Sequence, residues 1–299
     1  MARARDGKTR EQVMRVALLG TGAMGAPVAR RLAQGGWPVT AWNRTIERAR
    51  ALEDDGVTVA ETPAQAVAKA DVVLLWLADA DAIRASLDEA GGYPALAGRL
   101  VIQMGTIAPD ESRELAGAVE AAGGRYLECP VLGSIPEARD GRLILIAGGD
   151  EVTFAAAEPL LAAISPSPTR VGAVGQGAAT KLAFNHLIGA LTGAFSLSLG
   201  LVRREGVDTE TFMGLLRGSA LYAPTFDKKL ENMRQRDFAS ANFSTRHLLK
   251  DLRLFEMAAR EAGLDPQTVP ALAQAVEQTA EAGAADADYS ALYDTLDPR

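Results

Sequence analysis

The stretch Val171–Arg204, VGAVGQGAATKLAFNHLIGALTGAFSLSLGLVRR, divides the chain into two parts. A glycine-rich lead-in is followed by one long helical pattern, which carries no charged side chain from Leu182 to Val202. Strand and helix patterns alternate before this stretch, whereas only helical patterns follow it. The sequence therefore predicts two domains that are joined by one long helix.

One cation, Lys181, lies near the start of this apolar run. Lysine is seldom fully buried without a partner or a function, so Lys181 is the first candidate for catalysis. Asn185 follows four residues later, and side chains at i and i+4 share one helix face. We therefore expect a proton donor beside an amide. The alternative is a lysine that only caps the helix start, but helix N-termini disfavour cations.

Composition argues against several classes of function. The 299 residues carry a formal net charge of −7, which disfavours duplex nucleic acid as a partner. A single cysteine, Cys129, excludes an internal disulfide and a cysteine-based zinc site. It fits a reducing compartment, so we expect a cytoplasmic protein. The two histidines lack zinc-binding spacing, so we expect no metal site. Cys129 itself is expected in the core.

The segment Leu182–Val202 is about as long as a membrane-spanning helix. Asn185, His186, three glycines and several Ser and Thr residues argue against that interpretation. A helix that is apolar on all sides also suits a core or a subunit interface. We therefore expect no membrane contact, and a homodimer or homotetramer built on this helix.

A dinucleotide-binding pattern opens the chain, after a polar arm at residues 1–13 that lacks the apolar segment of a secretory signal. An apolar strand at Val13–Leu19 is followed by Gly20-Thr21-Gly22-Ala23-Met24-Gly25 and by a helical pattern through Gln34. The first glycine permits a tight bend, the second lets the backbone approach a pyrophosphate, and the third packs helix against strand. Because strand, turn and helix occur in this order, the motif predicts a dinucleotide site.

The second strand predicts which dinucleotide is bound. Pro38–Trp42 ends in Asn43-Arg44-Thr45, with no carboxylate to accept the ribose hydroxyls. Arg44 instead offers a planar fork that suits a phosphate. We therefore expect NADP(H), and the alternative is a solvated arginine at a strand end.

Further strand patterns at regular spacing predict a parallel, doubly wound sheet, whose ligand lies at the carboxyl ends of the strands. We assign residues 14–173 to this Rossmann domain and residues 174–299 to an all-α domain. The alanine-rich segment AEAGAADADYS near the C-terminus is expected to be frayed. The predicted strands are Asp71–Leu77, Leu100–Met104, Arg125–Cys129 and Arg142–Ala147.

Taken together, the motifs resemble those of the β-hydroxyacid dehydrogenase family, and most closely its glyoxylate/succinic semialdehyde reductase branch. They occur in the family's order over nearly the whole chain after the arm. The motifs are Gly20–Gly25, Pro130-Val131-Leu132-Gly133, Gly177-Ala-Ala-Thr-Lys181 and Lys250-Asp251.

The resemblance implies a role for each matching residue. Lys181 would be the catalytic acid, with Asn185 beside it. The substrate would meet Leu132, Gly133, Ser134, Phe243 and Asp251. The cofactor would meet Gly20, Thr21, Gly22, Ala23, Met24, Asn43, Arg44, Thr45, Leu77, Ala78, Thr106 and Lys250.

One residue departs from the family pattern. The family serine that helps to hold the substrate carboxylate is Leu132 here. An apolar side chain cannot donate a hydrogen bond and disfavours a nearby carboxylate. The backbone N–H groups of Gly133 and Ser134 remain candidates for binding an anion.

The expected reaction is the reduction of a small aldehyde or keto acid, such as glyoxylate or succinic semialdehyde, by hydride from NADPH. Lys181 would protonate the developing oxygen anion. One alternative is an imine reductase of the same architecture, which Leu132 favours and Lys181 disfavours. Another is a catalytically silent NADP-binding module, which would not need the proton donor.

Overall fold

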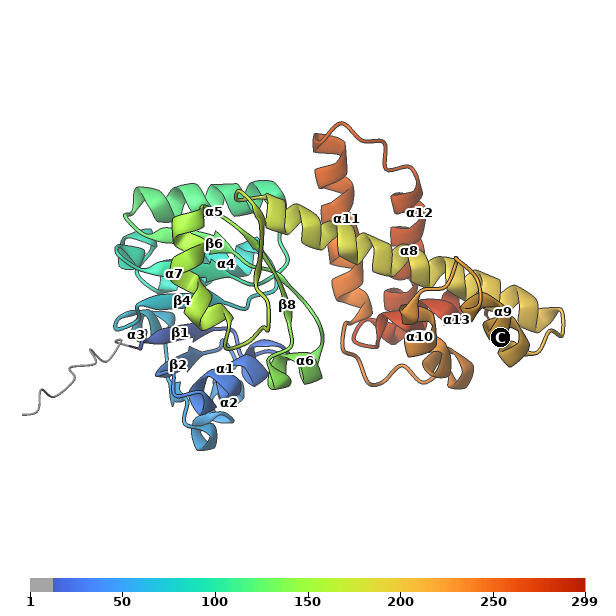
Figure 1. Cartoon of the computed structure of the whole chain (residues 1–299), viewed down its shortest axis with the longest axis horizontal. Helices are drawn as coiled ribbons and strands as arrows, with labels where there is room; N and C mark the ends of the chain where they lie inside the picture. Colours follow the sequence, from blue (N-terminus) through green and yellow to red (C-terminus); the bar gives the residue numbers. More distant parts are fainter. Residues whose placement is uncertain (1–12, 299) are drawn as a thin grey trace, which may run out of the picture.

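The computed structural model describes residues 13–298 of the chain. The predicted N-terminal arm lies outside this range, except for Val13. Two lobes are connected by one long helix that crosses between them (Figure 1). An α/β domain comes first and a helical domain second, which confirms the predicted fold class.

The sheet of the first domain has the strand order β3-β2-β1-β4-β5-β6-β8-β7, with β9 paired to β8. The order reverses between β1 and β4, and such a switch point is where a ligand crevice opens at the carboxyl ends of the strands. The strands are β1 Val16–Leu19, β2 Val39–Trp42, β3 Thr58–Val59, β4 Val72–Leu75, β5 Leu100–Gln103, β6 Arg125–Glu128, β7 Val131–Leu132, β8 Ile144–Gly148 and β9 Thr169–Gly172.

Helices cover both faces of this sheet, so its central strands are apolar throughout. In β1, Val16 and Leu18 pack on the side of α1 and α7, and Ala17 and Leu19 pack on the side of α3, α4 and α5. All four side chains are buried. The helices of this domain are α1 Gly25–Gln34, α2 Ile46–Arg50, α3 Pro63–Val67, α4 Ala80–Glu89, α5 Pro109–Ala121, α6 Ile135–Asp140 and α7 Glu151–Leu161.

The prediction of an all-parallel sheet is wrong at β8, the strand predicted at Arg142–Ala147. This strand runs antiparallel to both β6 and β7. The connection before it contains only the short helix α6, Ile135–Asp140, which is about 9 Å long at 1.5 Å per residue. So short a helix cannot return the chain to the opposite edge of the sheet, and β8 therefore runs back from the carboxyl edge.

The second domain contains only helices in the residues that the structure describes. Its core has two apolar clusters, one around Phe195 and Met233 and one around Leu252 and Val276. Its helices are α8 Gln176–Arg204, α9 Thr209–Arg217, α10 Pro224–Gln235, α11 Thr245–Glu261, α12 Thr268–Thr279 and α13 Leu292–Leu296.

The expectation that the alanine-rich segment near the C-terminus is frayed is wrong. Asp288 is fully buried, and both its carboxylate oxygens accept hydrogen bonds from Lys229 Nζ at 2.8 Å. Its N–H also donates to the carbonyl oxygen of Phe238 at 2.8 Å. The small residues around Asp288 have little local preference for structure, and the partner that orders them lies 59 positions earlier in the chain.

Helix α8 is long and apolar enough to cross a membrane by length and composition alone. In this structure 44% of its most apolar window is buried inside the chain. The helix packs against α11, α13 and α10, as well as against β8 and β9 of the first domain. These contacts give α8 the packing of a core helix on one of its sides.

Candidate active site between the two domains

The glycine turn after β1 has the shape that a dinucleotide requires. A Cβ atom at Gly20 would lie 2.2 Å from the carbonyl oxygen of Trp76, and one at Gly25 would lie 2.0 Å from that of Gly20. These two glycines therefore allow close packing of backbone. A Cβ atom at Gly22 would meet nothing within 4 Å, so its backbone faces open space where a ligand can approach. The helix start at Ala23 and Met24 follows directly.

Side chains around this turn support the same use. Asn43 Oδ1 accepts the N–H of Thr21 at 3.0 Å, and Asn43 Nδ2 donates to the carbonyl oxygen of Thr45 at 2.9 Å. Asn43 thereby ties the end of β2 to the glycine turn, and the neighbouring Arg44 is exposed. The buried polar atoms Thr21 Oγ1 and Trp76 Nε1 have no hydrogen-bond partner among the described residues. Such groups in a cradle of this shape fit a polar ligand.

The predicted catalytic pair forms, and it extends to a third residue. Lys181 Nζ donates to Asn185 Oδ1 at 3.0 Å, and Asn185 Nδ2 donates to Asp251 Oδ2 at 2.5 Å. Asn185 is 1% exposed and Asp251 is 2% exposed. The Asp251 carboxylate can only accept hydrogen bonds, so the NH₂ group of Asn185 must face Asp251. The amide oxygen of Asn185 therefore faces Lys181. Asp251 is thus held inside the domain and reaches Lys181 through Asn185.

Burial changes the acidity of Lys181. Loss of hydration lowers the pKa of the ammonium to about 8, the Asp251 carboxylate opposes this change, and the Lys250 ammonium adds to it. At neutral pH the ammonium is still mostly protonated, yet it releases a proton more readily than an exposed lysine. That acidity suits a general acid that works near pH 7.

Lys250 connects the two domains. Its Nζ donates to the carbonyl oxygens of Ala78 at 2.8 Å and of Thr106 at 2.6 Å, both at the carboxyl edge of the sheet. Lys250 Nζ also lies 3.1 Å from Asp251 Oδ1. Ala78 and Thr106, together with Leu77, belong to the loops that were predicted to meet the cofactor. The helix α11 therefore carries residues to both the lysine and the cofactor loops.

The turn at Leu132–Ser134 differs from the expectation. The N–H of Ser134 donates to Glu137 Oε2 at 2.8 Å, and the Ser134 hydroxyl donates to the same oxygen. These hydrogen bonds hold the pKa of Glu137 below its usual range, and the Lys228 ammonium of α10 contributes. A carboxylate of the chain therefore already occupies the Ser134 N–H. Leu132 is half-buried, and Gly133 is exposed.

The remaining side chains that the sequence brought into question pack against other residues in the described part of the chain. Cys129 is fully buried, and burial raises the pKa of its thiol. His186 stacks on Phe255 with ring centroids 4.3 Å apart. Phe243 packs edge-on against Tyr289 and stacks on His247. Within residues 13–298, no group of three or more His, Cys, Asp or Glu side chains is arranged to hold a metal ion.

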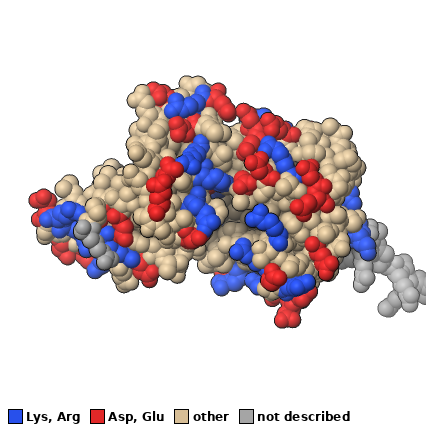
Figure 2. Space-filling model, turned by 180° about the vertical axis from the view of Figure 1, so that it is seen from behind, with Lys and Arg blue, Asp and Glu red and all other residues tan. Residues whose placement is uncertain are grey.

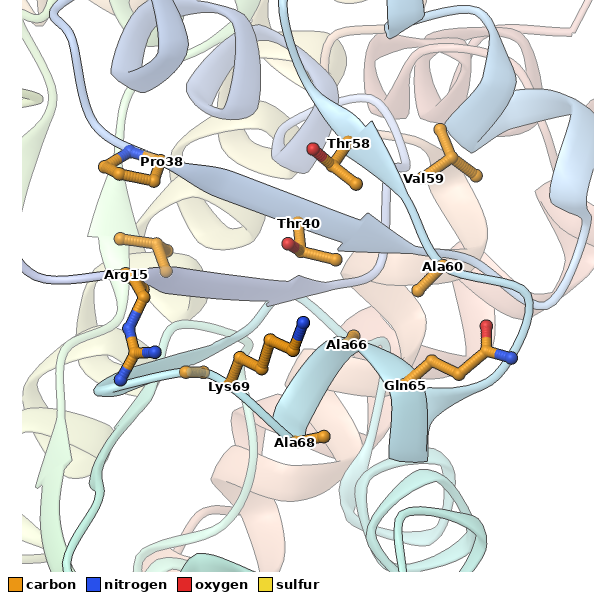
Figure 3. Close-up of a pocket in the computed structure, with 12 residues that line it drawn as sticks. Arg15, Pro38, Thr40, Thr58, Val59, Ala60, Gln65, Ala66, Ala68 and Lys69 are labelled. Carbon is orange, nitrogen blue, oxygen red and sulfur yellow. The ribbon is translucent and has the colours of Figure 1, made fainter.

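Two surface features help to place the site. Lys and Arg side chains border the hollow between the two lobes, where a phosphate-bearing ligand would be attracted (Figure 2). A depression of about 500 Å³ near the amino ends of β1 and β2 is lined by Arg15, Thr40, Thr58 and Lys69 (Figure 3). It lies at the end of the strands opposite to the glycine turn, so it is separate from the candidate site.

One residue that the sequence did not single out is Glu128, at the end of β6. It is fully buried and accepts hydrogen bonds from Ser112 and from three backbone N–H groups at the start of α8. The available signal was a carboxylate next to the buried residues Leu127 and Cys129, because a charged group is seldom fully buried without partners.

Two family matches cover most of the chain and meet at residue 175. Residues 15–175 match the NAD binding domain of 6-phosphogluconate dehydrogenase. Residues 175–296 match the NAD-binding domain of NADP-dependent 3-hydroxyisobutyrate dehydrogenase. Glyoxylate/succinic semialdehyde reductase 1 of Arabidopsis thaliana is 31% identical, with 95% of this chain and 98% of the relative covered.

Solved structures show the same similarity. A Mycobacterium tuberculosis 3-hydroxyisobutyrate dehydrogenase with L-serine has a TM-score of 0.86 and 27% identity, covering 95% of this chain and 99% of its own. A reductive aminase from Aspergillus terreus, in complex with NADPH and ethyl levulinate, has a TM-score of 0.63 and 27% identity, with the same coverage.

Proposed function

The chain belongs to the 3-hydroxyisobutyrate dehydrogenase/β-hydroxyacid dehydrogenase family of NAD(P)-dependent oxidoreductases, and from this premise we propose that it reduces small carbonyl compounds with NADPH. The single observation that carries the proposal is the buried set Lys181–Asn185–Asp251 beside the cofactor loops. It offers a lysine of lowered pKa whose hydrogen bond goes to a neutral amide.

The chain's own residues perform three tasks in this proposal. Backbone N–H groups at the start of α1 hold the pyrophosphate, since a helix N-terminus attracts anions. A bound nicotinamide cofactor would supply the hydride. Lys181 donates a proton to the carbonyl oxygen as negative charge develops there, and Asn185 keeps the ammonium directed.

We also propose that NADP(H) is the cofactor rather than NAD(H). Arg44 is exposed at the end of β2, where the ribose 2′ position is recognised in this fold, and the adjacent residues carry no carboxylate. Hydrogen bonds to charged groups contribute roughly 1.5–3 kcal/mol, so Arg44→Ala should weaken NADPH binding on the order of tenfold or more. NADH binding should change little. Equal loss for both dinucleotides would contradict this assignment.

The substrate class is tested by comparing three compounds under the same conditions. The purified protein is supplied with NADPH and with glyoxylate, succinic semialdehyde or a cyclic imine, and NADPH oxidation is recorded. Faster turnover of the aldehyde acids supports the proposal, as the similarity to glyoxylate/succinic semialdehyde reductase suggests. Tight NADPH binding without turnover of any of the three would favour a silent binding module.

An imine reductase is the second candidate, and it rests on the turn at Leu132–Ser134. Leu132 supplies no hydrogen bond, and the Ser134 N–H is already bound to Glu137. Both features disfavour a substrate carboxylate at this turn. The similarity to a reductive aminase agrees with this alternative. Faster turnover of the cyclic imine than of either aldehyde acid would establish it.

We propose further that two copies of the chain pair through α8. Large apolar side chains are exposed on one side of this helix, while its buried residues face the opposite side. The exposed residues are Phe184, Leu187, Leu197 and Leu201, with 40%, 51%, 55% and 63% exposure. Light scattering should give at least a dimer for the natural protein and a monomer for Leu197→Glu. A monomeric natural protein would contradict the pairing.

A further inference from the structure

We infer that Glu128 is a positioning residue for the reaction: its buried carboxylate fixes the start of α8 against the sheet and thereby sets the place of Lys181. The inference rests on the proposed role of Lys181 as proton donor. It concerns a residue that does not touch the reacting atoms and that acts through the helix.

The carboxylate of Glu128 is the centre of a buried hydrogen-bond network. Its Oε1 accepts the backbone N–H groups of Gly175 and Gly177 at 2.7 Å and that of Ala178 at 3.2 Å. Its Oε2 accepts a hydrogen bond from the Ser112 hydroxyl. Ser112 Oγ in turn lies 2.9 Å from the hydroxyl of Tyr126. The network therefore joins β6, α5 and the first turn of α8.

The partners of Glu128 all offer hydrogen-bond donors to its carboxyl oxygens. Every group that contacts the carboxylate can donate to it, because Tyr126 can donate to Ser112, which then donates onward. The start of a helix also carries a partial positive charge. Burial raises the pKa of Glu128, and these hydrogen bonds oppose that change. The arrangement therefore makes Oε1 an acceptor that holds a helix N-terminus.

Glycines make room for this contact. A Cβ atom at Gly148 would lie 2.2 Å from Glu128 Oε1, and one at Gly177 would lie 3.0 Å from the same atom. Gly175 has φ +95°, a conformation that other residues rarely adopt. The strand β8 and the start of α8 thus approach the carboxylate closely, and the geometry depends on its shape.

The anchored face of α8 is the face that carries the catalytic pair. Gly177, Lys181 and Asn185 are spaced by four residues and lie above one another on the helix. At 1.5 Å per residue, Lys181 is about 6 Å along the axis from Gly177. Lys181 therefore lies between two buried carboxylates, with Glu128 on the first-domain side and Asp251 of α11 on the other.

A small displacement of this segment would impair the reaction. A misplacement of about 1 Å can reduce a rate by on the order of 10²-fold, even when its cause is remote from the chemistry. A shift at Gly177 is transmitted to Lys181 because one helical turn separates them. The expected consequence is a loss in kcat, with little change in KM for the carbonyl substrate.

The test compares three substitutions of Glu128 with a matched control. Glu128→Gln keeps the shape, since its amide oxygen can accept the three N–H groups and its NH₂ can donate to Ser112. Glu128→Asp shortens the side chain, and Glu128→Ala removes the contact. The control is Asp150→Ala, which removes a carboxylate that accepts the Thr153 N–H at the start of α7.

We expect Glu128→Gln to keep kcat within about threefold, and Glu128→Asp and Glu128→Ala to lower it on the order of 10²-fold. KM should stay within about threefold in all of them. Asp150→Ala should lower the unfolding temperature without lowering kcat. If Glu128→Ala does not fold, the kcat of Glu128→Asp alone tests the inference. An unchanged kcat in Glu128→Asp, or a loss in Glu128→Gln as large as in Glu128→Asp, overturns the inference.

A second measurement separates this inference from the proposed function. Amide hydrogen exchange at Gly175, Gly177 and Ala178 should be at least about tenfold faster in Glu128→Asp than in Asp150→Ala. A tenfold faster exchange corresponds to a loss of about 1.4 kcal/mol in the free energy of local opening. This readout needs no substrate. If the natural protein reduces no carbonyl compound, the proposed function fails while the exchange still tests the anchor. Unchanged exchange overturns the anchor whatever the activity.

Discussion

Two lysines of the helical domain, the buried Lys229 and the half-buried Lys181, differ in the groups that they contact. Lys229 Nζ contacts both oxygens of Asp288 at 2.8 Å and lies 4.4 Å from the centre of the Tyr289 ring. Lys181 Nζ contacts the neutral amide of Asn185. The carboxylate nearest to it, that of Asp251, is reached only through that amide.

The difference separates a structural cation from the proposed proton donor. An ammonium that contacts a buried carboxylate at 2.8 Å orders the segments that the pair joins. An ammonium held by an amide is directed but not neutralised, so burial lowers its pKa to about 8. We therefore expect substitutions at the two lysines to affect different properties of the protein.

The largest expected effect is the loss of activity at Lys181. Removing a general acid lowers kcat by about 10²–10⁴-fold. Lys181→Ala should therefore lower the kcat of carbonyl reduction by that factor and leave the fold intact. Steady-state NADPH oxidation gives kcat, and circular dichroism checks folding. A variant with the kcat of the natural protein would show that Lys181 is not the proton donor, and the proposed difference between the two lysines would then be wrong.

The next effect concerns stability at the other lysine. Lys229→Ala leaves Asp288 buried without its cation, and breaking such a pair costs about 3–5 kcal/mol of unfolding free energy. Urea unfolding measures this change. The kcat of the folded variant should stay near the natural value, since Lys229 is not part of the candidate site. A loss of kcat without a loss of stability would contradict the structural role.

The pH dependence distinguishes the two directions of the reaction. Reduction needs the protonated Lys181, so its kcat should be constant at neutral pH and fall about tenfold per unit above a pH near 8. Oxidation of the alcohol needs the neutral amine and should rise through the same range. Profiles measured in both directions check this, and a reduction rate that rises with pH would exclude the lysine as acid.

The smallest expected effect is a change in the pKa of Lys181 when Asp251 is substituted. Its carboxylate raises the pKa of Lys181, opposing burial, so Asp251→Asn should lower that pKa further, by up to about one unit. The falling limb of the reduction profile should then move to lower pH. An upward movement would show that Asp251 does not act on Lys181 by its charge.

The sequence was informative where a motif is local. The glycine turn, the end of β2 and the pair Lys181–Asn185 depend on residues that are close in the chain, and each formed as predicted. The helical pattern that was predicted to run through Gln34 ends at that residue in α1. In these segments periodicity and caps alone determine the structure.

The sequence was not informative where the decisive partner is distant. The direction of β8 depends on how far α6 can carry the chain, which no single strand pattern encodes. The order of the segment around Asp288 depends on Lys229, and the burial of Glu128 depends on the start of α8, 47 to 50 positions later. The pattern of small residues alone predicted a frayed end.

The sequence by itself therefore determined the two-domain architecture, the dinucleotide turn and the pairing of Lys181 with Asn185. Only the tertiary structure decided which carboxylates hold the helix that carries Lys181, and that this lysine contacts an amide while Lys229 contacts a carboxylate. The physical reason is that helix periodicity and turn geometry act over a few residues. A buried charge, in contrast, is stabilised by whichever donors and counter-charges the whole fold brings within hydrogen-bond distance.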